Sequence, residues 1–117
     1  MQKKLLIGGL IASLTMGVAV ADSLREVTKE LSNINVPAIQ AVQAAEQLFQ
    51  GQTFDVDLES NFMGTYWQIK MIAPDQRLIE AYVDGKTGQV VAAEETVQVK
   101  GKKQKTRTQY QNGQPVQ

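Results

Sequence analysis

Three segments of the chain alternate apolar and polar residues, and their agreement on one pairing register limits the folds open to the chain. The segments are residues 53–59, 66–71 and 79–84. A two-residue period is typical of a strand that buries one face. Placing Leu58 opposite Trp67 puts every apolar residue of the first two segments on one side, and a one-residue slip would undo this. The same register pairs Lys70 with Asp55 on one neighbour and with Glu80 on the other. The sequence therefore predicts an antiparallel meander.

A tight turn follows the third segment. Its residues include Asp84, Gly85 and Gly88. An aspartate can accept hydrogen bonds from the backbone ahead of it, and glycines can adopt positive φ, so the pattern is typical of a β-hairpin. The apolar alternation resumes at once beyond this turn. We therefore expect a fourth strand over residues 89–95, with Val90 beside Val83.

An amphipathic segment precedes the strands. Asn35 is suited to cap the start of a helix and Gly51 to end it, which predicts a helix over residues 36–50. Its apolar residues fall on one face: Ala38, Ile39, Ala41, Val42, Ala45, Leu48 and Phe49. We expect this face to pack on the sheet, where Phe54 would also be buried. A capping-box pattern at Ser23 predicts a short helix further upstream. The predicted fold class is α+β, with one main helix packed on a four-stranded antiparallel meander sheet and a short extra N-terminal helix.

The first 21 residues have the pattern of a secretory signal peptide. Lys3 and Lys4 precede an apolar run, and small residues stand at positions 19 and 21, which predicts cleavage after Ala21. A membrane anchor is the alternative, but the 17 residues from 5 to 21 are few for a bilayer span and include three glycines. We expect a periplasmic or secreted protein with its folded domain over residues 22–95.

The composition excludes several kinds of active site. The chain has no histidine and no cysteine, so it cannot build Ser-His or Cys-His pairs or the usual zinc sites. Asp55, Asp57 and Glu59 form a row of carboxylates on the first strand, which could serve as paired acids or bind calcium. An extended strand spreads such groups along an open face, so we interpret the row as a solvated surface neutralised in part by Lys70. We expect no catalytic residue, no metal site and no cofactor.

The charge is unevenly distributed. Residues 22–95 hold all twelve acidic residues and five basic ones, whereas residues 96–117 hold five basic residues and no acidic one. The basic residues of this tail are Lys100, Lys102, Lys103, Lys105 and Arg107. With few apolar side chains to bury, the tail is predicted to be disordered beyond about Lys100. It is either a plain solvated extension or an electrostatic contact with an anionic envelope surface or with another copy; nucleic acid is not an expected partner, because the export signal points elsewhere.

Two apolar residues stand where the first turn should be polar. Phe62 and Met63 lie between Asn61 and Gly64. By strand parity Phe62 could close the core, and the alternative is that both residues form a contact surface for a partner.

The strand and turn patterns together resemble the PepSY domain family over residues 34–95. The resemblance rests on the Ala38-Ile39 pair in the helix, on the alternation Trp67-x-Ile69-x-Met71, and on the closing pattern Tyr82-Val83-Asp84 followed by Thr87-Gly88-x-Val90. It implies an extracytoplasmic module that binds and restrains peptidases, and it carries over no catalytic residue. The basic tail departs from the family pattern.

We therefore predict a non-catalytic binding module outside the cytoplasm, an inhibitor or modulator of secreted or periplasmic peptidases. The alternative is an envelope interaction protein held at anionic surfaces by its basic tail. An enzyme is the third and least favoured possibility, because the sequence shows no pair of a nucleophile and a base. The number of subunits is left open by the sequence.

Overall fold

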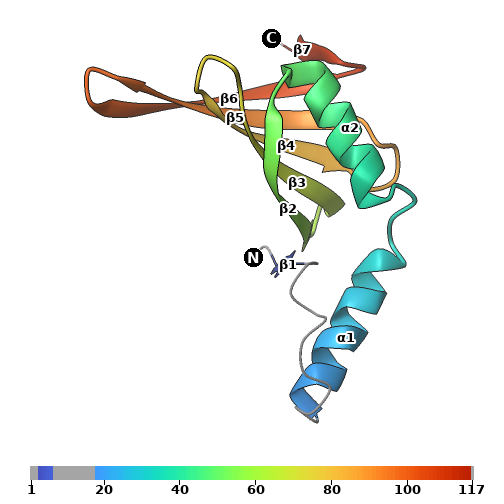
Figure 1. The fold of residues 1–117 in the computed structure, drawn as a ribbon. Helices are drawn as coiled ribbons and strands as arrows, with labels where there is room; N and C mark the ends of the chain where they lie inside the picture. The colour runs from blue at the N-terminus through green and yellow to red at the C-terminus, as the bar shows by residue number, and fades with distance from the viewer. Residues whose placement is uncertain (1–2, 7–17, 117) are drawn as a thin grey trace.

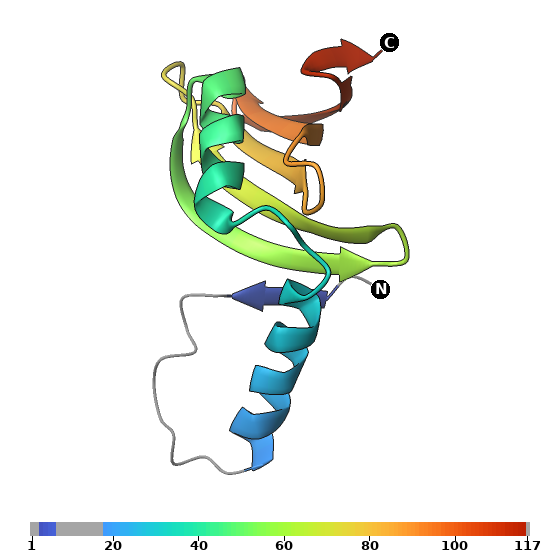
Figure 2. The same cartoon turned by 90° about the vertical axis from the view of Figure 1, so that its right-hand side faces the viewer.

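A computed structural model describes residues 3–6 and 18–116. The helices are α1 (Val18–Leu31) and α2 (Ala38–Phe49). The strands are β1 (Lys3–Leu6), β2 (Gln52–Asn61), β3 (Gly64–Ile72), β4 (Leu78–Asp84), β5 (Val90–Val99), β6 (Lys102–Gln111) and β7 (Gln114–Val116). They form one antiparallel sheet in which each strand pairs with its neighbours in sequence. Figures 1 and 2 show α2 lying across one face of this curved sheet, with α1 extending away from it beside β1.

The predicted register of the central strands is confirmed. Leu58 pairs with Trp67, and Lys70 pairs with Asp55 on β2 and with Glu80 on β4. Val83 and Val90 also pair as expected. The register agrees with the alternating pattern, because a one-residue slip would move apolar side chains to the polar face.

The predicted number of strands and the predicted length of the first helix are wrong, although the α+β class and the two helices hold. The sheet has seven strands instead of four, and α1 spans 14 residues instead of a short helix around a cap at Ser23. β1 adds a strand beside β2, and β5 continues to Val99 before the chain turns back into β6. The main helix is therefore packed on one part of a wider sheet.

The prediction that residues beyond about Lys100 are disordered is also wrong. β6 pairs with β5 over eight register positions, from Ala92 with Gln109 to Val99 with Lys102. The turn between them has Lys100 at φ 54° and Gly101 at φ 78°, and a similar turn at Asn112 and Gly113 leads into β7. Two successive residues with positive φ are typical of the tight hairpin turns that match the twist of paired strands. Polar strands can thus be ordered by backbone pairing to an existing sheet.

The core lies between α2 and the sheet. Ala41 and Ala45 of α2 are fully buried, which lets the helix approach the strands closely. The largest buried side chains come from β2, β3 and β4: Leu58, Trp67, Ile69, Met71, Ile79 and Val83. Trp67 also donates a hydrogen bond from Nε1 to the backbone oxygen of Val36 at 2.8 Å. This bond fixes the start of α2 on the sheet.

Two residues expected in the core are exposed. Ile39 is 69% exposed, because the buried stripe of α2 runs along Ala41 and Ala45 and leaves Ile39 on the flank of the helix. Phe54 is 60% exposed, because the register shifts between Thr53 and Asp55 and the extra residue is left outside the ladder. A β-bulge of this kind changes which side of the strand a residue faces, which strict alternation cannot foresee.

The helix cap also differs from the prediction. α2 begins after Pro37 without a side-chain cap. Asn35 instead donates its backbone N–H to the oxygen of Gly85 at 2.8 Å, and Val36 donates to the same oxygen at 3.0 Å. The loop before α2 is therefore attached to the β4–β5 turn.

None of the helices in the described part of the chain has the length and apolar character needed to cross a bilayer. Most of the apolar run of the predicted signal peptide lies outside the described residues. Cleavage after Ala21 therefore stays a prediction.

Candidate functional site

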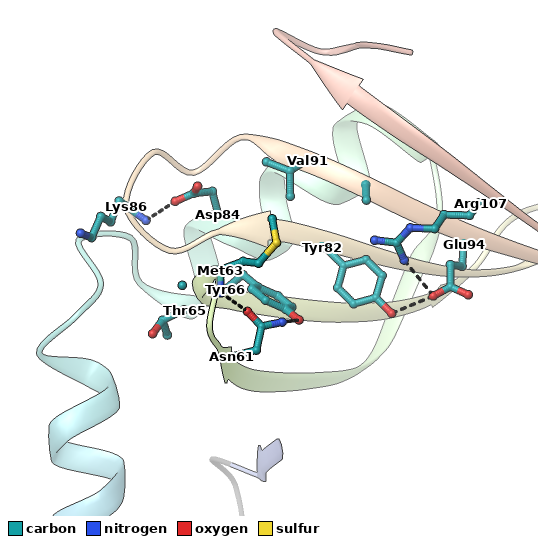
Figure 3. A pocket seen from close by; sticks show the side chains of 12 residues that line it. Asn61, Met63, Thr65, Tyr66, Tyr82, Asp84, Lys86, Val91, Glu94 and Arg107 are labelled. Atoms are coloured by element: carbon teal, nitrogen blue, oxygen red, sulfur yellow. Dashed lines mark hydrogen bonds and ion pairs between the residues drawn. The ribbon is translucent and has the colours of Figure 1, made fainter. Parts of the chain in front are cut away.

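An open groove of about 500 Å³ lies on the face of the sheet opposite α2, which we call the outer face. Its lining comes from the β2–β3 turn and from strands β3 to β6. The side chains that shape it include Asn61, Met63, Tyr66, Tyr82, Glu94 and Arg107 (Figure 3). Apolar rings and charged groups therefore meet in one hollow, which is typical of a binding surface.

Two tyrosines form the floor of the groove. Tyr66 pairs with Asp84 and Tyr82 pairs with Gln68, so the two tyrosines are diagonal neighbours on the outer face of β3 and β4. Their ring centroids are 5.6 Å apart and their planes meet at 73°, an edge-to-face contact. Asn61 donates a hydrogen bond from Nδ2 to the Tyr66 hydroxyl at 2.9 Å, so the turn residue holds this ring in place.

Glu94 of β5 connects the tyrosines to the basic strand β6. The Tyr82 hydroxyl donates to Glu94 Oε1 at 3.1 Å, and Arg107 Nη1 lies 3.2 Å from the same oxygen. Lys105 Nζ lies 3.3 Å from Glu94 Oε2. The Arg107 guanidinium carbon also stands 5.3 Å from the centre of the Tyr82 ring, within the range of a cation–π contact. Three side chains thus surround one carboxylate.

These contacts perturb the protonation of both partners. Burial, followed by the charge of Glu94 and the hydrogen bond to it, raises the pKa of Tyr82 well above its usual value. Burial alone would raise the pKa of Glu94 too, but the hydrogen bonds from Tyr82 and Lys105 and the nearby positive charges outweigh it, so the pKa of Glu94 is lowered. At neutral pH the groove therefore presents a neutral phenol that donates to a charged carboxylate.

The tip of the β2–β3 hairpin borders the groove and is exposed. Phe62 is 95% exposed and Met63 is 78% exposed, so the interpretation that Phe62 closes the core is wrong. The backbone N–H of Met63 donates to Asn61 Oδ1 at 2.8 Å, which ties the tip to the residue that orients Tyr66. Exposed apolar side chains at an ordered turn are suited to contact a partner, and this role stays a prediction for both residues.

The five basic residues predicted to act as one tail are divided by the fold. Lys105 and Arg107 lie on the sheet and pair with Glu94. Lys100, Lys102 and Lys103 are exposed at the far end of the β5–β6 hairpin, which extends beyond the other strands in Figure 1. We call these three lysines the basic tip.

The carboxylate row on β2 is mostly buried, which corrects its interpretation as a solvated face. Asp57 is only 1% exposed and Glu59 only 3% exposed. Asp55 is less buried, and its Oδ2 lies 3.8 Å from Lys70 Nζ, as the predicted register requires. Asp57 and Glu59 are the register partners of Leu6 and Lys4 on β1, so the added strand lies against this part of β2. The described residues contain no group of three or more histidine, cysteine, aspartate or glutamate side chains placed to hold a metal ion.

The sequence did not predict the groove, because one of its lining residues, Arg107, comes from β6, a strand that was not expected. Tyr66 and Tyr82 alternate with core residues and could be assigned to the outer face, but Arg107 was placed in a disordered tail. One signal was present: Asn112-Gly113 is a strong hairpin pattern. It predicts paired strands on either side, and with them the return of Arg107 to the sheet.

Comparison with known proteins gives one match. The family model described as "Peptidase propeptide and YPEB domain" (PepSY) matches residues 36–94, which is half of the chain. The matched segment contains α2, β2, β3 and β4 and ends within β5 at Glu94. No curated protein and no solved structure matches the chain.

Proposed function

Because this chain belongs to the PepSY family, we propose that it is a non-catalytic binding module that works outside the cytoplasm and inhibits or modulates peptidases. The family match over residues 36–94 is the observation that carries the proposal, since the family is described by its place in peptidase propeptides. The signal-peptide pattern of the first 21 residues supports the same compartment.

The hairpin tip and the groove are the contact surface in this proposal. Phe62 and Met63 supply exposed apolar area, and the adjoining tyrosines supply rings with hydrogen-bonding hydroxyls. Apolar and aromatic anchors surrounded by polar groups are typical of protein interfaces. A partner seated on the tip would cover the groove and reach Arg107.

The test is inhibition of a purified secreted metallopeptidase by the purified protein. We expect peptidase activity to fall as protein is added, and the double variant Phe62→Ser/Met63→Ser to inhibit at least about tenfold less well, because each anchor contributes about 1–2 kcal/mol. The matched control is Leu24→Ser/Leu31→Ser, which removes apolar side chains that are 43% and 41% exposed on α1. Unchanged activity at saturating protein, across several peptidases, would contradict the proposal.

A second function is supported by the basic tip. Lys100, Lys102 and Lys103 stand together at the end of a projecting hairpin, where they can approach an anionic lipid surface without moving the rest of the fold. Binding to vesicles that contain an anionic phospholipid should weaken steeply as ionic strength rises. Changing all three lysines to glutamine should abolish it, whereas the same charge removal at Arg25, Lys29 and Lys86 should not.

A further inference from the structure

The side of β6 that faces away from β5 is a free edge over most of its length. β7 pairs with β6 only from Gln109 to Gln111, with Val116 opposite Gln109. In the part of the chain that the structure describes, no strand pairs with residues 102–107 on that side. These residues belong to the hairpin that extends beyond the other strands (Figure 1). Edge strands present unpaired backbone N–H and C=O groups, which an added strand can satisfy.

β7 shows that this side of β6 accepts a strand. It is only three residues long, it includes a proline, and it has no charged side chain, yet it is ordered beside β6. It runs antiparallel to β6, from Gln114 opposite Gln111 to Val116 opposite Gln109. A partner segment that docks beside residues 102–107 would continue the line of β7.

The side chains of this edge alternate in chemistry. Lys105 and Arg107 lie on the outer face, where both contact Glu94, and Lys103 shares that face because it stands two residues before Lys105. We call these three residues the outer row. The side chains on the opposite face are Lys102, Gln104 and Thr106. All six side chains are exposed. A docked strand would therefore meet a cation at every second residue on the outer face.

The outer row carries more positive charge than its neighbours on β5 neutralise. Lys103 pairs with Gln98 and Lys105 pairs with Thr96, both uncharged, whereas Arg107 pairs with Glu94. Glu94 is thus the one carboxylate among these three register partners, and Lys105 and Arg107 share it. Among the described residues, no carboxylate forms an ion pair with Lys103. The outer row therefore stays positive towards the free edge.

Glu94 also shows how a carboxylate fits beside this row. Its two oxygens lie 3.3 Å from Lys105 Nζ and 3.2 Å from Arg107 Nη1. These two cationic side chains are 57% and 53% exposed, so they can reach a second carboxylate that arrives from the free side. Opposite charges on facing residues of paired strands are stabilising, and like charges are destabilising.

The same rule disfavours a second copy at this edge. If β6 of another copy docked antiparallel here, the two outer rows would face each other and repel. Charge complementarity instead favours a strand with acidic residues on the outer face.

We propose that the edge of β6, residues 102–107, is the docking site for an extended segment of a partner protein that pairs antiparallel to β6 and carries aspartate or glutamate at every second residue. This inference goes beyond the proposed function, because it concerns a strand that follows the matched family segment, which ends at Glu94. In the sheet, β4 and β5 stand between this edge and the β2–β3 hairpin.

The test uses three labelled peptides, the full chain and fluorescence anisotropy at low ionic strength, where exposed ion pairs are strongest. The first probe is Glu-Thr-Glu-Thr-Glu-Thr, the second has the same residues in blocks, Glu-Glu-Glu-Thr-Thr-Thr, and the third is the first probe with every backbone nitrogen methylated. We expect the alternating probe to bind at least about fivefold more tightly than the block probe, because only alternation places each carboxylate beside the outer row. The methylated probe keeps the charges but cannot donate backbone hydrogen bonds, and it should bind at least about tenfold more weakly.

Matched variants on the same hairpin locate the binding. Lys103→Gln/Lys105→Gln removes two charges from the outer row and should weaken binding of the alternating probe at least about fivefold. Lys100→Gln/Lys102→Gln removes two charges from the turn and from the opposite face, and it should change the affinity by less than about twofold. Lys103→Gln alone should also weaken binding, and since it breaks no ion pair among the described residues, the fold is kept.

Three results would overturn the proposal. Equal binding of the alternating, block and methylated probes, or equal loss in the two double variants, would mean attraction by net charge alone. Binding to vesicles of an anionic phospholipid without binding to any of the peptides would remove the edge site and leave the role of the basic tip in place. The peptidase role is judged separately with Phe62→Ser/Met63→Ser, which leaves β6 unchanged.

Discussion

Tyr82 is the residue on which the groove depends most. Its hydroxyl donates to Glu94 Oε1 at 3.1 Å and accepts a hydrogen bond from Gln68 Nε2 at 3.2 Å, while its ring contacts Tyr66 and Arg107. One side chain thereby links β3, β4, β5 and β6. The groove owes its shape to the ring and its polarity to the hydroxyl.

Changing Tyr82 to Phe should separate these two contributions. The ring would keep its place, but Glu94 would lose a donor, and we expect the free energy of unfolding to fall by about 1.5–3 kcal/mol, the usual value of a hydrogen bond to a charged group. Urea denaturation measures the change. A double-mutant cycle with Glu94→Ala, which removes the acceptor, should give a coupling energy of about 1 kcal/mol, and strictly additive effects would contradict the hydrogen bond.

Glu94 should also make stability depend on pH in the acidic range. Its pKa in the folded protein is lower than the ordinary 4.5, because the hydrogen bonds and positive charges around it outweigh the effect of burial. The folded state therefore binds this proton less readily than the unfolded state, so the stabilisation is present above pH 4.5 and is lost as pH falls through the lower, folded value. Thermal unfolding across this range measures it. Glu94→Gln should flatten the pH dependence, and an unchanged slope would contradict this assignment.

At the level of elements, the β4–β5 turn holds the start of α2 through Gly85. A Cβ atom at Gly85 would lie 2.7 Å from the backbone oxygen of Thr65 and against Cγ2 of Ile34, so a side chain does not fit there. Its backbone oxygen accepts hydrogen bonds from both Asn35 and Val36. From the sequence, Gly85 was expected to allow the backbone conformation of a turn. In the structure, Ile34 and Thr65 lie so close to it that no side chain fits.

Changing Gly85 to Ala should therefore destabilise the protein. We expect a loss of about 1–3 kcal/mol in the free energy of unfolding, the usual cost of forcing an extra carbon into a packed site. Gly101→Ala is the control, since no atom lies within 4 Å of a Cβ there and only the positive φ opposes the change. The prediction is wrong if Gly85→Ala costs no more than Gly101→Ala in the same denaturation experiment.

Substitutions at the tip of the β2–β3 hairpin should leave the stability almost unchanged, unlike Gly85→Ala. Phe62 and Met63 are exposed, so replacing both by serine should change the free energy of unfolding by less than about 0.5 kcal/mol. Chemical denaturation measures this, with Trp67→Phe as a core substitution that must destabilise the protein. A large loss of stability in Phe62→Ser/Met63→Ser would mean that the tip packs on the fold and is not a free contact surface.

Helices and strands could be predicted from the sequence wherever the apolar residues kept a single spacing without interruption. Leu58, Trp67 and Val83 were assigned to the right strands and the right register because alternation ties each to its neighbours. Phe54 was misplaced because a bulge adds one residue without leaving a pattern in composition. Ile39 was misplaced because an apolar stripe read from the sequence is wider than the face that the sheet covers.

At the level of the whole molecule, the sheet extends well beyond the matched family segment. β6 and β7 follow residue 94, where the match ends, and they carry Arg107, Lys105 and Tyr110. The Tyr110 ring meets Phe49 of α2 edge-on, with centroids 5.6 Å apart. This segment could not be recognised by apolar content, because its order comes from backbone pairing to β5 and from a few side-chain contacts. The groove is thus shared between the family segment and the added strands.

A chain that ends at Val99 tests whether these added strands belong to the fold. Truncation would remove Tyr110 from Phe49 and both cations from Glu94, and it would leave β5 as an unpaired edge. We expect a loss of about 2 kcal/mol or more in the free energy of unfolding, measured by urea denaturation, together with self-association at high concentration in sedimentation experiments.

Two further variants separate the causes of this loss of stability. Tyr110→Ala removes the ring contact and Lys105→Gln/Arg107→Gln removes the ion pairs, and each should account for only a part of the loss. The remainder belongs to the backbone pairing of β6 with β5, which amide hydrogen exchange should reveal as protected N–H groups in residues 102–109 of the full chain. Because a disordered tail would exchange freely and would be removed without cost, unprotected amides in this segment and an unchanged stability after truncation would together mean that β6 and β7 are not part of the stable fold.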